Sequence, residues 1–330
     1  MSPIGGKMKV LVTGGTGFVG SSLAQHLATT GADVTICDNN FRGRLDKHME
    51  DLIDQYNMKF VLCDLTKPAD FEKLEKDYDE IYHLAAINGT GNFYKIPQKV
   101  IRVNILSVIN LLDWIVNNNI KSKLLFSSSS EAYADTPDKS IPTPESVALT
   151  IKDVFNERFS YGGSKIAGEL LFINYAKSYN LDFRIVRYHN VYGPRMGFEH
   201  VMPQMAQRAY EKENPFRVFG SDQTRAFCYV EDAAEATCLT MRSEDLRGQV
   251  VNIGTDEETK IEDIASIITN MFEYEPRLDS LEAPQGSTPR RCPDITRLVV
   301  STGFVPKTPL IEGVAKTVKW YKEYYESLSE

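Results

Sequence analysis

A glycine-rich segment near the N-terminus limits what this chain can fold into more than any other feature. Residues 14–20 read GGTGFVG, directly after the apolar run Lys9 to Thr13 and directly before residues with helical spacing. Gly14, Gly17 and Gly20 permit a tight turn, close approach of a ligand to the backbone, and close packing of helix on strand. The free amides at the start of that helix can then bind a pyrophosphate. The segment therefore predicts a strand, an anion-binding turn and a helix.

Short apolar runs and helical stretches continue to alternate over the first half of the chain. Strands that are apolar on both faces are typical of a parallel sheet, and repeated strand–helix units predict a doubly wound α/β fold of Rossmann type with right-handed crossovers. After about residue 187, loops rich in Pro, Gly and Arg predict a smaller, interleaved α/β region over the active edge of the sheet. The predicted strands are Lys9 to Thr13, Val34 to Asp38, Lys59 to Asp64, Glu80 to Leu84, Lys123 to Ser127 and Phe183 to Arg187, and two of the predicted helices are Val19 to Thr29 and Val103 to Asn117.

Acidic residues at the ends of the next strands indicate which dinucleotide would bind. Asp38 ends the second predicted strand, where its carboxylate can accept hydrogen bonds from both ribose hydroxyls and would repel a 2′-phosphate. Arg42 and Arg44 follow closely, so use of NADP stays open. Asp64 can meet the adenine edge or cap a helix. We predict NAD, and the residues predicted to bind it here are Gly14, Gly17, Phe18, Val19, Gly20, Asp38, Asn39, Asp64 and Leu65.

A tyrosine and a lysine stand four residues apart at the start of an apolar helix. Tyr161 and Lys165, in YGGSK, share one helix face, and a nearby ammonium lowers a phenol's pKa, which would make Tyr161 usable as a base. The fifth predicted strand ends in SSSSE, which brings the hydroxyls of Ser129 and Ser130 and the carboxylate of Glu131 to the same edge of the sheet. Together these residues predict proton-transfer chemistry beside the dinucleotide.

Eight motifs in the same order resemble the extended short-chain dehydrogenases that act on nucleotide sugars, the NAD-dependent epimerase/dehydratase family. The resemblance covers nearly the whole chain and is closest to the UDP-glucuronate decarboxylase branch. It implies an NAD-binding domain made of residues 1–187 and about 226–258, and a nucleotide-sugar domain made of about 188–225 and 259–330. The motifs are GGTGFVG, CDNNFRGR, HLAA, SSSSEAY, YGGSK, RYHNVYGPRM, DQTRAFCYVED and RRCPD.

The resemblance also implies roles for individual residues. Tyr161 would take the proton of the sugar O4 while the C4 hydride passes to NAD, Lys165 would hold the nicotinamide ribose, and Ser129 would hydrogen-bond the same oxygen. Further contacts are implied for the cofactor at Leu84, Ala85 and Ala86, and for the substrate at Ser130, Asn190, His200, Arg225 and Arg291, of which Asn190 and Arg225 would grip the diphosphate.

The second chemical step stays open between three outcomes. Glu131 matches the glutamate of dehydratases and uronate decarboxylases, which favours decarboxylation or 4,6-dehydration over 4-epimerisation. Ser130 departs from the Asp of many 4,6-dehydratases. His200 stands near the place where decarboxylases carry an Arg for the uronate carboxylate. A 4-epimerase is the alternative, and an NAD-binding regulator without turnover is a remote one.

Composition limits the partners and the compartment. The net charge of −8 argues against nucleic acid as the main partner. The five scattered cysteines without a CxxC pair indicate a reducing compartment, with neither a metal site nor a disulfide framework. We expect no membrane span, a cytoplasmic location, a UDP-sugar as the favoured substrate, and a homodimer formed through the Tyr161 helix and the helix before it.

Overall fold

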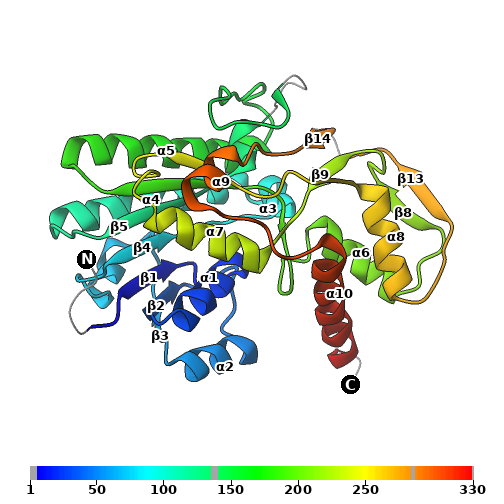
Figure 1. The fold of residues 1–330 in the computed structure, drawn as a ribbon, viewed down its shortest axis with the longest axis horizontal. Coiled ribbons are helices and arrows are strands. Elements are labelled where there is room, and N and C mark those ends of the chain that lie inside the picture. The colour runs from blue at the N-terminus through cyan, green and yellow to red at the C-terminus, as the bar shows by residue number, and fades with distance from the viewer. Residues whose placement is uncertain (1–5, 135–139, 284–286, 329–330) are drawn as a thin grey trace.

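A parallel sheet of seven strands forms the centre of the computed structural model, which describes residues 6–134, 140–283 and 287–328 (Figure 1). The strand order is β11-β6-β5-β4-β1-β2-β3, with every neighbouring pair parallel. The Rossmann-type doubly wound fold predicted from the sequence is therefore confirmed. The strands are β1 (Lys9–Thr13), β2 (Asp33–Asp38), β3 (Lys59–Leu62), β4 (Glu80–His83), β5 (Lys123–Ser129), β6 (Phe183–Tyr188) and β11 (Val250–Ile253).

Helices cover both faces of this sheet (Figure 1). One face packs against α1 (Phe18–Thr29), α2 (Lys47–Tyr56), α7 (Val230–Arg242) and α9 (Thr296–Thr302), and the other against α4 (Pro97–Asn117) and α5 (Phe159–Tyr179), with the short helix η1 (Pro68–Lys73). The short helices η2 (Ser130–Tyr133) and α3 (Thr90–Lys95) follow β5 and β4 at the edge where the strands end. This arrangement leaves the carboxyl ends of the strands free for a ligand site.

A second region with its own apolar core lies beside that edge and appears at the right of Figure 1. Its helices are α6 (Val201–Tyr210), α8 (Ile261–Met271) and α10 (Leu310–Ser327). Its strand pairs are β8 (Phe216–Phe219) with β13 (Leu278–Leu281), and β9 (Thr224–Ala226) with β12 (Glu258–Lys260) and β14 (Arg290–Arg291). The short pair β7 (Val191–Tyr192) and β10 (Cys228–Tyr229) connects the two regions. The predicted smaller, interleaved α/β region is present.

Helix α9 corrects one predicted boundary. The sequence reading placed all of 259–330 in the second region, but Leu298 and Phe304 are buried in the core that contains Val10 and Val12 of β1. The helix packs on α7 and β11, because its apolar side chains complete the cover of that end of the sheet. Residues 296–304 therefore extend the sheet region. The rest of the domain division stays a proposal.

Helix α4 is long and apolar enough, by length and composition alone, to cross a membrane, and it is the one such helix in the described part of the chain. Eight of its residues are buried against the rest of the protein. Among them, Asn104 accepts a hydrogen bond from the backbone N–H of Ile87 and donates one to its carbonyl. This packing is that of a core helix which also holds the loop after β4.

Candidate active site

One large pocket opens at the carboxyl ends of the strands, where the strand order reverses between β1 and β4. Its cavity of about 1880 Å³ exceeds the ~300–1,000 Å³ of a site for one small ligand, so it has room for two. Both regions of the protein line it. Every residue predicted for the site reaches this pocket: Gly14, Gly17, Phe18, Val19, Gly20, Asp38, Asn39, Asp64, Leu65, Leu84, Ala85, Ala86, Ser129, Ser130, Glu131, Tyr161, Lys165, Asn190, His200, Arg225 and Arg291.

The glycine turn has the shape that an anion-binding helix start requires. Gly14 adopts φ +71°, and its N–H donates to the carbonyl of Cys37 at 2.8 Å. A Cβ on Gly20 would overlap the Gly14 carbonyl, so only glycine lets α1 begin this close to β1. No side chain caps the first free amides of α1 at Gly17, which leaves them available to a diphosphate.

Asp38 lies beside this turn at the end of β2. Its carboxylate accepts hydrogen bonds from the backbone N–H of Thr16 at 3.3 Å and of Asn40 at 2.9 Å. These bonds hold the carboxylate at the pocket wall, where NAD's ribose hydroxyls would be recognised. Asp64 accepts hydrogen bonds from the N–H and hydroxyl of Thr66 and so caps the turn after β3. The residues present therefore fit NAD.

Tyr161 and Lys165 lie together on α5, but their electrostatics differ from the sequence prediction. The Lys165 Nζ is 5.6 Å from the Tyr161 ring centroid and donates to the Ser127 carbonyl at 2.7 Å. Burial raises the pKa of Tyr161, against which a hydrogen bond with Ser129 acts, and burial lowers the pKa of Lys165 to about 7. The predicted lowering of the phenol's pKa by Lys165 is thus wrong for the ligand-free protein, because desolvation dominates both groups.

Glu169 is a contributor that the sequence analysis missed. It is buried one turn beyond Lys165, binds Arg187 at 2.6 and 2.8 Å, and accepts a hydrogen bond from Ser128. Its charge opposes the effect of burial on the pKa of Lys165. The i,i+4 spacing from Lys165 was visible in the sequence, but its pairing with β6 was not.

Glu131 is held between two arginines at the other end of the pocket. Arg291 lies 2.6 Å and Arg158 3.4 Å from its carboxylate. Burial alone would raise the pKa of Glu131, but these two guanidinium groups lower it to about 2. Arg158 was not predicted as a single residue. Its signal was the long loop TIKDVFNERFS before Tyr161, which the family resemblance already placed at the sugar pocket.

Arg225 brings a further cation to the same wall. Within the described residues, its hydrogen bonds go to neutral groups, such as Gln223 at 2.9 Å and Ser287 at 3.3 Å. Burial and the neighbouring Arg291 lower its pKa to about 10. Asn190 lies nearby and donates to the Ala226 carbonyl at 3.2 Å. A buried guanidinium without a carboxylate partner is suited to an anionic ligand.

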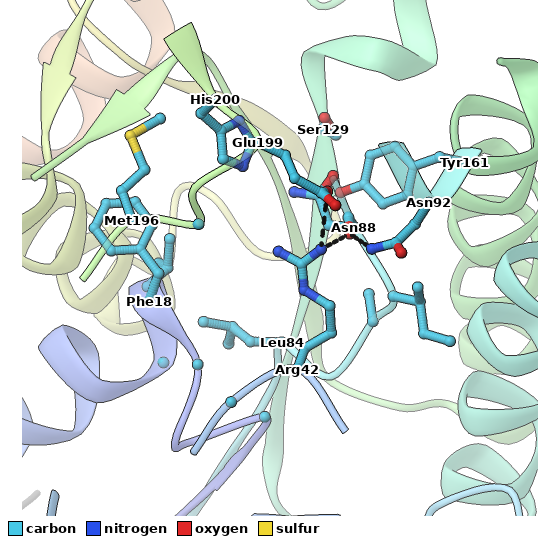
Figure 2. A pocket seen from close by; sticks show the side chains of 18 of the residues that line it. Phe18, Arg42, Leu84, Asn88, Asn92, Ser129, Tyr161, Met196, Glu199 and His200 are labelled. Carbon is cyan, nitrogen blue, oxygen red and sulfur yellow. Dashed lines mark hydrogen bonds and ion pairs between the residues drawn. The ribbon is translucent and has the colours of Figure 1, made fainter. Parts of the chain in front are cut away.

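His200 and Arg42 meet across the pocket (Figure 2). His200 precedes α6, and burial together with Arg42 lowers its pKa to about 4, so it is neutral at pH 7 and cannot supply a cation there. Arg42, considered above for a 2′-phosphate, instead donates to the Asn88 carbonyl and lies 3.8 Å from Glu199. The guanidinium points into the cavity, toward the residues around Tyr161.

Comparison with known proteins identifies the fold and site as those of one family. Residues 10–254 match the NAD dependent epimerase/dehydratase family. The chain belongs to this family. NAD is therefore its cofactor, as predicted, and the chain is an enzyme of the class that the motifs indicated.

Individual relatives within the family carry out different reactions. A UDP-N-acetyl-alpha-D-glucosaminuronate decarboxylase of Bacillus cytotoxicus is 32% identical, over 96% of this chain and 98% of the relative. A solved UDP-N-acetylglucosamine 4-epimerase of Methanobrevibacter ruminantium is 31% identical with a TM-score of 0.85, over 96% and 99%. A solved UDP-glucuronic acid 4-epimerase variant of Bacillus cereus, in complex with UDP-4-deoxy-4-fluoro-glucuronic acid and NAD, is 27% identical with a TM-score of 0.84, over 96% and 100%.

Proposed function

We propose that this enzyme removes carbon dioxide from a UDP-linked sugar acid by way of a 4-keto intermediate. The observation that carries the proposal is the Arg158–Glu131–Arg291 cluster beside Ser129 and Tyr161. A general base at C5 works best with a pKa near the operating pH, and a carboxylate with a pKa of about 2 is a poor one. Dehydration needs that base, whereas decarboxylation does not.

Charge at this wall also favours an acidic substrate. Three guanidinium groups, those of Arg158, Arg225 and Arg291, surround the single carboxylate of Glu131. The surplus positive charge can neutralise a diphosphate and leaves the sugar end electropositive. Arg225 and Asn190 are the proposed diphosphate ligands, and Ser130 and Arg291 lie closer to the sugar because both adjoin Glu131.

Each step assigns a task to a named side chain. When bound, NAD takes up the C4 hydride and later returns it. Tyr161 accepts the O4 proton, Ser129 hydrogen-bonds the same oxygen, and protonated Lys165 offsets the developing phenolate. In the resulting β-keto acid the C5–C6 bond breaks, carbon dioxide leaves, and the electron pair moves onto the C4 oxygen as an enolate. Tyr161 and Ser129 stabilise that oxygen until a proton from solvent reaches C5.

The decarboxylase relative supports this reaction because the alignment spans 98% of its length. The second candidate is 4-epimerisation, which the solved epimerases favour through their matching fold and nearly complete coverage. Both reactions share the C4 oxidation and differ only in whether carbon leaves.

The mass of the product distinguishes the candidates. Purified enzyme with NAD and UDP-glucuronate, or its N-acetylated counterpart, is expected to yield a product lighter by one carbon dioxide. A product of unchanged mass with inverted C4 would establish the epimerase, and loss of water would establish a dehydratase. Tyr161→Phe serves as the control and should abolish every product.

We also propose that the sheet region binds NAD and the second region binds the UDP-sugar, that the enzyme acts in the cytoplasm, and that it forms a homodimer through α4 and α5. Apolar residues of both helices support the dimer: Ile101 on α4 and Leu170 on α5 are 40% and 57% exposed.

A further inference from the structure

The loop between β2 and α2 places Arg42 at the anion-binding end of the cofactor site. Its neighbour Gly43 packs on the glycine turn so closely that a Cβ there would lie 2.7 Å from the Gly17 nitrogen, the first free amide of α1. Residues 14–30 carry neither Lys nor Arg, so the turn itself offers a diphosphate only backbone amides. Arg42 is the adjoining side chain that can add a positive charge.

The Arg42 side chain extends from this turn to the opposite wall. Its guanidinium donates to the Asn88 carbonyl of the β4–α3 loop and reaches the loop before α6, where a Cβ on Gly197 would lie 3.0 Å from it. A Cβ on Gly89 would overlap the same group. Figure 2 shows the side chain crossing the pocket between Leu84 and Glu199. Both glycines therefore leave room for the guanidinium to span the cavity.

The charge of Arg42 is only partly balanced in this position. Glu199 lies 3.8 Å away, which is too far for a hydrogen bond, and its buried Oε2 has no hydrogen-bond partner among the described residues. Burial lowers the pKa of Arg42, and the carboxylate of Glu199 offsets only part of that effect. A buried guanidinium with one distant counter-ion gains free energy when a strong anion binds it.

We propose that Arg42 retains the cofactor: its guanidinium binds the diphosphate of NAD and ties the β2–α2 loop to the sugar-binding region through Asn88 and Glu199. The inference rests on the proposed function in one respect, because a reaction that returns its hydride to the sugar requires the same NAD to stay bound. It assigns Arg42 to the diphosphate, in place of the 2′-phosphate considered from the sequence.

Retention of NAD can be measured without any sugar. The enzyme is loaded with NADH, and its release is followed by fluorescence after a chase with excess NAD, while NAD carried through gel filtration is quantified by mass spectrometry. Arg42→Ala is expected to release the cofactor roughly ten- to a hundred-fold faster than wild type, as for loss of a charge-assisted hydrogen bond. Arg42→Lys keeps the charge without the planar fork and should fall between them.

Arg44→Ala is the matched control, since Arg44 is exposed in the same loop and removes the same charge. It should release NADH close to the wild-type rate. Equal release by wild type and Arg42→Lys and Arg42→Ala would overturn the proposal, as would an equal effect of Arg44→Ala. Unchanged release with a raised KM for acidic sugars would also overturn it and move Arg42 to the sugar. Fast release by Arg42→Ala in an enzyme that yields no carbon dioxide would support Arg42 and reject the decarboxylase.

Discussion

At the scale of single residues, burial decides the chemistry of the pocket more than sequence neighbours do. Lys165 and Glu131 are both ionisable and both line the pocket, yet their pKa values move by opposite causes: desolvation lowers that of Lys165, and two arginines lower that of Glu131. The proposed roles follow from this difference. Lys165 is poised to share its proton near neutral pH, whereas Glu131 stays ionised.

Replacing Lys165 with Met should stabilise the protein in a pH-dependent way. The pKa of Lys165 is about 7 when folded and about 10.5 when unfolded, so the unfolded chain binds more protons between these values and wild-type stability rises with pH across that window. Lys165→Met should therefore be more stable at pH 7, by about 2–3 kcal/mol after loss of the hydrogen bond to Ser127. Thermal unfolding of both proteins at pH 7 and pH 10 measures this.

The advantage of Lys165→Met should shrink toward zero by pH 10, while its turnover is lost at every pH. A stability difference that stays constant from pH 7 to pH 10 would contradict the assigned pKa. Because other titrating groups are common to both proteins, the difference isolates Lys165.

At the scale of elements, the start of α1 depends on a contact between two backbone segments. Gly20 approaches the Gly14 carbonyl so closely that a side chain at 20 must push the helix away from the turn. Short strands place the remaining groups: β2 ends at Asp38, and β5 continues to Ser129, two residues beyond its predicted end. That extension holds Ser129 at the pocket in extended backbone.

Gly20→Ala should weaken cofactor binding and the fold together. The Cβ meets backbone and not a flexible side chain, so relief requires the turn to open, at about 1–3 kcal/mol of overpacking strain. We expect a lower Tm and at least a roughly ten-fold weaker NAD affinity by calorimetry. Ser22→Ala, two residues further along α1, is the control and should change neither by a comparable amount. Wild-type NAD affinity in Gly20→Ala would show that the turn tolerates opening.

At the scale of the whole molecule, the pocket exists because two regions face each other across the strand ends. Glycine turn, Asp38 and Tyr161 come from the sheet region, while Arg225 and Arg291 come from β9 and β14. Neither region alone surrounds a nucleotide sugar and a dinucleotide. Helices α4 and α5 lie on the sheet face, away from the second region (Figure 1), so pairing there would leave the pocket open.

The proposed dimer predicts a specific sensitivity to charge. Leu170→Arg on α5 should give a monomer at micromolar concentration in light scattering, because it buries an unpaired charge in the interface. Ile311→Arg is the control: Ile311 is 64% exposed on α10, and this variant should stay dimeric. A monomeric wild type, or dissociation of both variants, would contradict the α4–α5 interface.

The sequence alone was sufficient for the features that short segments encode. Six strands, the glycine turn, the Tyr161–Lys165 spacing and the family itself all follow from contiguous motifs, because local periodicity and turn chemistry act within a few residues. Strand β11 escaped prediction, since a four-residue apolar run becomes a strand only when β6, some 60 residues earlier, is there to pair with it.

Only the tertiary structure decided which charges meet. It brought Arg158 and Arg291 onto Glu131, carried Arg42 across the cavity to Asn88 and Glu199, and packed α9 onto the sheet. It also determined that burial, and not the neighbouring ammonium, controls the pKa of Tyr161. Electrostatic energies and desolvation depend on every group within several ångströms, whatever its distance along the chain, so no local pattern contains them.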